Sequence, residues 1–233
     1  MKKILFILIA SLLCCGAIDA KPSKKCAKKA TTTKLTEKCD HEWVDLGLPS
    51  GTLWATTNVG ASKPEEYGSY FAWGETKPKK SYSLNNYKWC RGSLNRLTKY
   101  CTDSSYGTVD GKKELELEDD AAYVNWGPEW RMPSKEQQDE LRAECTWTWT
   151  ERNGVYGYEV SRNGKSIFLP ANGERYKKKH NRVGTYGGYW STTLDADGPS
   201  NSFDLTFNPD NVDWVAGGRD YGQCVRAVRM SKE

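Results

Sequence analysis

The residues best suited to chemistry in this chain are its cysteines, its two histidines and one dense group of carboxylates. Beyond residue 20 the sequence holds six cysteines: Cys26, Cys39, Cys90, Cys101, Cys145 and Cys224. An even number of cysteines in an exported chain favours disulfide bonds over metal or catalytic roles, although six cysteines allow fifteen pairings. The simplest nested set predicts the disulfides Cys26–Cys39, Cys90–Cys101 and Cys145–Cys224.

Metal and catalytic motifs are missing from the sequence. It has no CxxC pair, and His41 and His180 are its only imidazoles, so we expect no zinc site. It also lacks a GxSxG elbow and an HExxH helix. The carboxylates of Glu118, Asp119 and Asp120 could form a solvated or arginine-paired loop, a calcium site or a catalytic pair. We favour the first, with Arg131 as partner of Asp119 or Asp120, and expect no metal, no cofactor and no catalytic residue.

The first twenty residues have the layout of a secretory signal. Lys2 and Lys3 precede an apolar run that ends at Leu13, and small residues lead to Ala20. The run is too short to span a bilayer core of about 30 Å as a helix. We expect cleavage after Ala20 and a protein that is secreted or held at the outer cell surface. Lipidation of Cys14 or Cys15, which would anchor the chain to a membrane, stays open.

Positive charge is concentrated at the start of the chain. Residues 1–40 carry nine lysines and three acidic side chains, a net charge of +6, so the remaining residues carry −2 of the overall +4. A near-neutral body without a basic stripe argues against a nucleic-acid partner. Residues 21–40 are interpreted as a lysine-rich tether, with a surface-adhering basic arm as the alternative. Residues 41–233, which hold all ten tryptophans, are interpreted as one domain.

Short segments bounded by turns predict a mixed fold rich in strands and ordered loops. The Asn163-Gly164 pair between two such segments predicts a tight hairpin. Strands are expected over residues 52–57, 145–150, 156–161, 166–169, 202–207 and 225–228. In the stretch WGPEWRMPS, Pro133 ends an extended segment and Ser134 with Gln137 forms a capping box. A helix is therefore expected over residues 135–144.

Seven motifs in order resemble the Fibrobacter succinogenes major paralogous domain, a family frequent in exported proteins of gut and rumen Bacteroidetes. They are DLGLPSGTLWA at 45–55, YFAWGE at 70–75, LELEDDAA at 115–122, WGPEWRMPS at 126–134, FLPANGER at 168–175, GGYWSTT at 187–193 and CVRAVR at 224–229. The family is similar in turn to the formylglycine-generating-enzyme-like branch of the C-type lectin fold. The resemblance implies an α+β, C-type-lectin-like fold with small twisted antiparallel sheets, one or two short helices and long ordered loops. In it, WGPEWRMPS is scaffold and CVRAVR closes a sheet near the first strand.

The catalytic relatives of that fold use residues that this chain lacks. Formylglycine-generating enzymes need two closely spaced cysteines near the C-terminus, where this sequence has Cys224 alone. Sulfoxide-synthase relatives need a histidine cluster, and calcium-dependent lectins carry an E-P-N or Q-P-D triplet that Asn208-Pro209-Asp210 echoes only in part. We therefore expect no enzyme and no calcium-dependent lectin.

The last third of the chain is rich in aromatic residues, amides and glycines, a mixture typical of recognition surfaces. Trp190 and Phe203 are expected in the core. We expect a binding module whose C-terminal loops recognise an extracellular protein or carbohydrate; a structural cell-surface component and a formylglycine-generating-type enzyme are the alternatives. The candidate ligand-binding residues are Tyr189, Asn211, Trp214, Arg219 and Tyr221.

Overall fold

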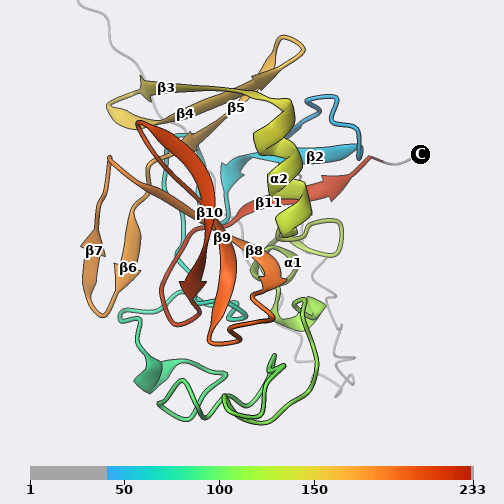
Figure 1. Cartoon of the computed structure of the whole chain (residues 1–233). Coiled ribbons are helices and arrows are strands. Elements are labelled where there is room, and N and C mark those ends of the chain that lie inside the picture. Colours follow the sequence, from blue (N-terminus) through green and yellow to red (C-terminus); the bar gives the residue numbers. More distant parts are fainter. Residues whose placement is uncertain (1–40, 232–233) are drawn as a thin grey trace, which may run out of the picture. The chain divides into compact units, whose positions relative to one another are not determined.

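Small antiparallel sheets, two α-helices and long loops make up the computed structural model of the chain, which describes residues 41–231 (Figure 1). The predictions for the signal and tether, and those for Cys14, Cys15, Cys26 and Cys39, lie outside the described residues. The described residues belong to one compact unit. The coarse class is a strand-rich α+β fold, as the sequence predicts. Among the described residues, no helix is long and apolar enough to span a bilayer.

The first sheet joins the two ends of the described chain. It has the order β1 (Trp43–Val44), β2 (Thr52–Asn58), β11 (Arg226–Met230), and both pairings are antiparallel. Arg226 is fully buried, and its guanidinium donates to Asn58 Oδ1 and to the carbonyls of Ala55, Thr56 and Phe168. The predicted pairing of CVRAVR with an N-terminal strand is therefore present.

The second sheet supplies the frame for the site described below. Its order is β10 (Asn211–Gly218), β9 (Asn201–Asn208), β8 (Gly187–Leu194), with β9 in the middle. Phe207 packs on one face of this sheet, where its ring lies over that of Tyr189. On the other face Trp190, Asp204 and Val215 occupy matching positions of the three strands. Loops cover this face too, so β9 is buried on both sides.

Two further sheets are built from consecutive strands. A three-stranded sheet has the order β3 (Thr146–Arg152), β4 (Val155–Arg162), β5 (Lys165–Pro170), and a hairpin pairs β6 (Glu174–Tyr176) with β7 (Lys179–Asn181). The turn between β4 and β5 has positive φ at Asn163 (53°) and Gly164 (72°), the conformation that a two-residue hairpin requires. The Asn-Gly prediction is confirmed.

The WGPEWRMPS corner connects α1 (Ala121–Trp126) to α2 (Lys135–Glu144). Ser134 and Gln137 form the predicted capping box at the start of α2. The corner is held by Asp120, whose carboxylate accepts from the amides of Ala122, Tyr123 and Met132. Two 3₁₀ turns, η1 (Leu84–Asn86) and η2 (Leu117–Asp119), precede it.

Arg131 forms no ion pair with Asp119 or Asp120 among the described residues, although its charge lowers the pKa of Asp120 against the larger effect of burial. Its guanidinium donates to the carbonyls of Pro128 and Trp130 and lies over the ring of Tyr123. Asp119 is held instead by lysines, as described below.

The predicted disulfides Cys90–Cys101 and Cys145–Cys224 are absent: all four residues are free thiols. Three of the thiols contact separate backbone carbonyls: Cys90 that of Leu84, Cys101 that of Asp103, and Cys224 that of Tyr67. Cys224 is fully buried in the main core, whereas Cys145 is partly exposed at the end of α2. The order of the cysteines along the sequence does not show how far apart they lie in the fold. The predicted pairing, which used that order alone, was therefore wrong.

Candidate ligand-binding site

A cavity of about 230 Å³ lies over the Asp204 face of the second sheet. We call it the Asp204 pocket. Side chains from three parts of the chain line it, together with the backbone of β10; the lining residues are Glu174, Arg182, Tyr186, Asp204, Val215, Gly217, Gly218, Tyr221 and Gln223. Asp204 comes from β9, Glu174 from β6, and Tyr221 and Gln223 from the segment that joins β10 to β11.

Asp204 and Gln223 form a buried polar pair beneath the pocket. The two residues are 1 % and 2 % exposed, and Gln223 Nε2 donates to Asp204 Oδ2 over 3.1 Å. The other oxygens of the pair, Asp204 Oδ1 and Gln223 Oε1, have almost no accessible surface.

Electrostatics at the pocket favour a neutral Asp204. Burial raises the pKa of this carboxyl well above its ordinary range, and the neighbouring Glu174 raises it further, whereas Arg182 and hydrogen bonds from the backbone amides of Asp204 and Gly217 lower it. Burial is the largest cause because a carboxylate loses its hydration there. Asp204 is thus held as a carboxylic acid to a higher pH than an exposed aspartate.

The rings of Tyr186 and Tyr221 form walls of the pocket, and each packs against another side chain. The guanidinium of Arg182 lies 3.5 Å from the ring centroid of Tyr186 and forms an ion pair with Glu174 at 3.0 Å. The ring of Tyr221 stacks on that of Tyr176, with centroids 4.6 Å apart. Both rings are half-buried, so each keeps part of its surface open to solvent.

Gly217 lets the backbone of β10 approach the buried carboxyl closely. A Cβ atom at this position would lie 2.7 Å from Asp204 Oδ1, nearer than real Cβ atoms come to other atoms. Glycine at this position therefore allows the Asp204 side chain to pack against the backbone of β10.

Of the five residues predicted to bind a ligand, Tyr221 alone lines this pocket. Tyr189 is 1 % exposed, and its hydroxyl donates to the carbonyl of Pro170, so it is a core residue. Arg219 is also 1 % exposed: its guanidinium donates to Tyr87 Oη and to the carbonyls of Lys99, Tyr100 and Pro199. These two predictions are wrong because both side chains are buried and donate their hydrogen bonds to backbone carbonyls.

Trp214 and Asn211 belong to other parts of the surface. Trp214 pairs with Leu205 and therefore lies on the opposite face of the sheet from Asp204. Its indole N–H donates to Asp139, and Lys135 Nζ lies 3.2 Å from its ring centroid. Asn211 is exposed at the start of β10, where its backbone amide donates to Asn208 Oδ1. Trp190 is buried as predicted, whereas Phe203 is only half-buried.

Asp204, at the centre of the pocket, was not predicted as a site residue from the sequence. Asp204 lies between Phe203 and Leu205 in an alternating strand, where a charged residue indicates the solvent face. That face becomes buried only because loops around Glu174 and Gln223 fold over it. An aspartate between two apolar residues in the middle of a strand was the one local signal.

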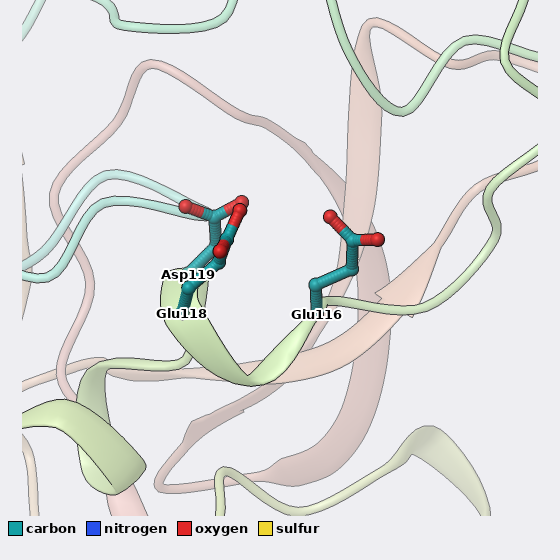
Figure 2. A group of neighbouring side chains, drawn as sticks. All are labelled: Glu116, Glu118 and Asp119. Atoms are coloured by element: carbon teal, nitrogen blue, oxygen red, sulfur yellow. The ribbon is translucent and has the colours of Figure 1, made fainter.

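The predicted acidic cluster is present, but Glu116 takes the place of Asp120 in it. Glu116, Glu118 and Asp119 bring carboxylate oxygens within 4.8 Å of one another (Figure 2), while Asp120 is turned towards the corner. Lys99 Nζ contacts all three, at 2.5 Å from Glu116, 3.3 Å from Glu118 and 2.6 Å from Asp119. Lys88 and Lys112 pair with the same cluster.

The positive charges of these lysines balance the negative charges of the carboxylates in the cluster. Hydrogen bonds from Lys112 and Lys99 lower the pKa of Glu116 to about 2. Burial lowers the pKa of Lys99, but hydrogen bonds to Asp119 and Glu116 outweigh it and leave the pKa raised. An ammonium group therefore already sits where a metal ion would bind, and the cluster is a lysine-paired loop.

A larger cavity of about 540 Å³ lies between the WGPEWRMPS corner and β11. Its arginines are engaged: Arg131 by backbone carbonyls and Arg229 by Glu129, although Arg229 Nε has no partner among the described residues. We favour the Asp204 pocket because two tyrosine rings that are open to solvent enclose it.

Comparison of the whole chain with models of known families, with curated proteins and with solved structures finds no match.

Proposed function

We propose that this protein is an exported, non-catalytic binding module of the Fibrobacter succinogenes major paralogous domain type, with a C-type-lectin-like fold. Its ligand is an extracellular protein or glycan, and the C-terminal loops around the Asp204 pocket make the contact. The ordered motifs and the pairing of β11 with β2 support the fold assignment. The predicted signal supports a location outside the cell, in secreted or lipid-anchored form.

One observation carries the binding role: two tyrosine rings that are open to solvent enclose a pocket of about 230 Å³ above the buried pair of Asp204 and Gln223. The rings offer rigid contact area at low cost in conformational entropy. A small pocket with convergent polar groups is a typical ligand site.

The groups near the pocket and at Cys224 favour binding over catalysis. Glu174 is engaged by Arg182, and Asp204 is hydrogen-bonded to Gln223, so neither resembles a free catalytic carboxylate. Burial raises the pKa of the Cys224 thiol to about 12, and a reactive cysteine needs a thiolate at neutral pH. This argues against the formylglycine-generating alternative, whose remaining candidate was Cys224.

The test compares wild type with Tyr221→Ala on glycan arrays and in pull-downs with defined extracellular proteins. Tyr221→Ala removes a pocket wall, and we expect a loss of binding of about threefold to tenfold. Tyr156→Ala is the matched control, because Tyr156 is also an exposed ring stacked on one aromatic residue, Trp149. Equal loss in both variants, or no ligand for wild type, contradicts the proposal and leaves the structural-component alternative.

A further inference from the structure

A cavity of about 460 Å³, separate from the Asp204 pocket, is lined by three basic residues and by no acidic one. We call it the Arg175 pocket. Arg175 comes from β6, and Lys79 and Lys80 come from the loop before η1; the other lining residues are Gly68, Ser69, Tyr70, Pro78 and Tyr82. The charge of this cavity favours an anionic ligand.

Arg175 has a guanidinium group without an anionic partner. Its side chain is half-buried and forms no hydrogen bond or ion pair with another described residue; it lies over the ring of Tyr70, 4.8 Å from the centroid. Its nitrogen atoms keep accessible surface, unlike the enclosed Nε of Arg229. A planar guanidinium binds a carboxylate through two parallel hydrogen bonds, and that of Arg175 is free to do so.

The surrounding structure holds Arg175 in place before a ligand binds. The backbone of Arg175 exchanges two hydrogen bonds with Gly222, each 2.8 Å long. The ring of Tyr70 beneath the guanidinium is buried, and its hydroxyl donates to the carbonyl of Asn172. Binding therefore costs little additional ordering at this residue.

A turn made of lysines lies beside the pocket. Tyr82 and Lys177 exchange backbone hydrogen bonds, so the turn between β6 and β7 lies next to the loop before η1 (Figure 1). The turn consists of Lys177 and Lys178, both exposed. Lys177 has a φ of 53°, a conformation that asparagine and glycine adopt more readily in a two-residue hairpin. A lysine at this strained position indicates a use for its charge.

The ammonium groups around the pocket are available to an anion. Lys80, Lys177 and Lys178 form no ion pair with a described residue, whereas Lys79 is held by Glu75 at 2.8 Å. We call the three available lysines and Arg175 the basic patch.

The surroundings of the basic patch favour one class of polyanion. Residues 41–233 carry a net charge of −2, so the positive charge does not extend over the surface as nucleic-acid binding requires. Among the described residues, no large exposed hydrophobic side chain belongs to the patch or lines its pocket, which leaves nothing to insert into a lipid surface. A peptide with several carboxylates fits both the concave pocket and the lysines beside it.

We propose that the basic patch binds an acidic segment of an extracellular partner protein. One aspartate or glutamate carboxylate enters the Arg175 pocket and accepts two hydrogen bonds from the guanidinium, while further carboxylates pair with Lys80, Lys177 and Lys178. Because these charges stay partly hydrated, binding weakens as ionic strength rises. The site is distinct from the Asp204 pocket and goes beyond the function proposed above.

The test follows the fluorescence anisotropy of a labelled hexaglutamate peptide mixed with the mature chain. Wild type should bind it at low ionic strength and more weakly at physiological ionic strength, and hexaglutamine should not bind. Arg175→Gln should bind hexaglutamate about tenfold or more weakly, because the charge-assisted pair is lost. Arg175→Lys should recover only part of this loss, since an ammonium group lacks the planar fork. The lysine-rich tether is the same in every variant and cancels from the comparison.

Arg152→Gln is the matched control. Arg152 is also half-buried and lies over an aromatic ring, that of Phe168 at 4.9 Å, but it pairs with Glu159 and lies outside the pocket. This variant should bind within about twofold of wild type.

Lys177→Asn separates binding from folding. Asparagine tolerates a positive φ better than lysine does, so this variant should be at least as stable in urea as wild type. It should nevertheless bind hexaglutamate about twofold more weakly, the effect of one exposed ion pair. Circular dichroism confirms that the other variants are folded.

Three outcomes would contradict the proposal. If Arg175→Gln binds as wild type does, or Arg152→Gln loses as much, the assignment to the basic patch is overturned. If duplex DNA or vesicles that contain phosphatidylglycerol bind more tightly than hexaglutamate in a manner that depends on Arg175, the acidic protein partner is overturned. If hexaglutamate does not bind at low ionic strength, the proposal fails, while the Tyr221→Ala test of the proposed function is unaffected.

Discussion

At the scale of single residues, Asp204 links the candidate site to stability. Its carboxyl is shielded by β8 and β10, and the charged groups facing it are Glu174 and Arg182. Native Asp204 keeps its proton to a higher pH than the unfolded chain does. The unfolded state thus binds fewer protons above its pKa of about 3.9, and the free energy of unfolding falls as pH rises from there until the native carboxyl ionises.

Asp204→Asn should remove this penalty. Its free energy of unfolding, relative to wild type, should increase from pH 4 towards neutral pH, as measured by urea denaturation at a series of pH values. The exposed Asp197→Asn serves as control and should show no such trend. A difference between Asp204→Asn and wild type that is independent of pH would mean that Asp204 is ionised in the native protein.

Buried arginines show why single residues of the site were hard to assign from sequence. Arg219 and Tyr221 lie two positions apart in a glycine-rich, polar stretch, yet the first is enclosed by carbonyls and the second lines the pocket. The sequence around both residues has the same composition, so composition cannot distinguish them. Their different exposure follows from the loops around Tyr87 and Tyr100, which fold over Arg219 and have no regular period in the sequence.

At the scale of elements, motifs of a few neighbouring residues predicted the local structure correctly. The capping box at Ser134 and the Asn163-Gly164 turn depend on neighbouring residues alone, and both form as predicted. The role of Asp120 depends on a residue twelve positions away, Met132, and was not foreseen. Prediction from the residues themselves succeeded where the stabilising contact is local, whereas the long-range pairing of β11 with β2 was foreseen only through the family resemblance.

These two caps should differ in their contribution to stability. Ser134→Ala loses one helix cap and should lower the free energy of unfolding by about 1 kcal/mol. Asp120→Ala loses the cap of α1 and also leaves the buried Met132 amide without its acceptor, so we expect about 2 kcal/mol or more. Urea denaturation of both variants checks the order, and an equal or larger loss for Ser134→Ala would contradict the role of Asp120 in the corner.

At the scale of the whole molecule, the core is built from aromatic rings and buried thiols without cross-links between the described cysteines. Burial raises the pKa of Cys224 to about 12 and that of Cys145 to about 11. A thiol of raised pKa in a closed core reacts slowly with alkylating reagents.

Alkylation without reductant should therefore distinguish native from unfolded protein. In urea, iodoacetamide should modify the peptides that contain Cys90, Cys101, Cys145 and Cys224, as measured by mass spectrometry. In the native protein, Cys145 should be modified first among these four, since it alone is partly exposed. Recovery of a Cys145–Cys224 or Cys90–Cys101 disulfide peptide would restore the original pairing and contradict the arrangement of thiols described above.

The pairing of β11 with β2 has a consequence for the order of folding. Arg226 and Asn58 are 168 positions apart in the chain, yet their side chains are joined by a hydrogen bond in the buried part of this sheet. A ribosome must therefore synthesise nearly the whole domain before the middle strand acquires its second neighbour. Until then one edge of β2 is open to mispairing, and nascent chains should need protection by chaperones up to the last stages of translation.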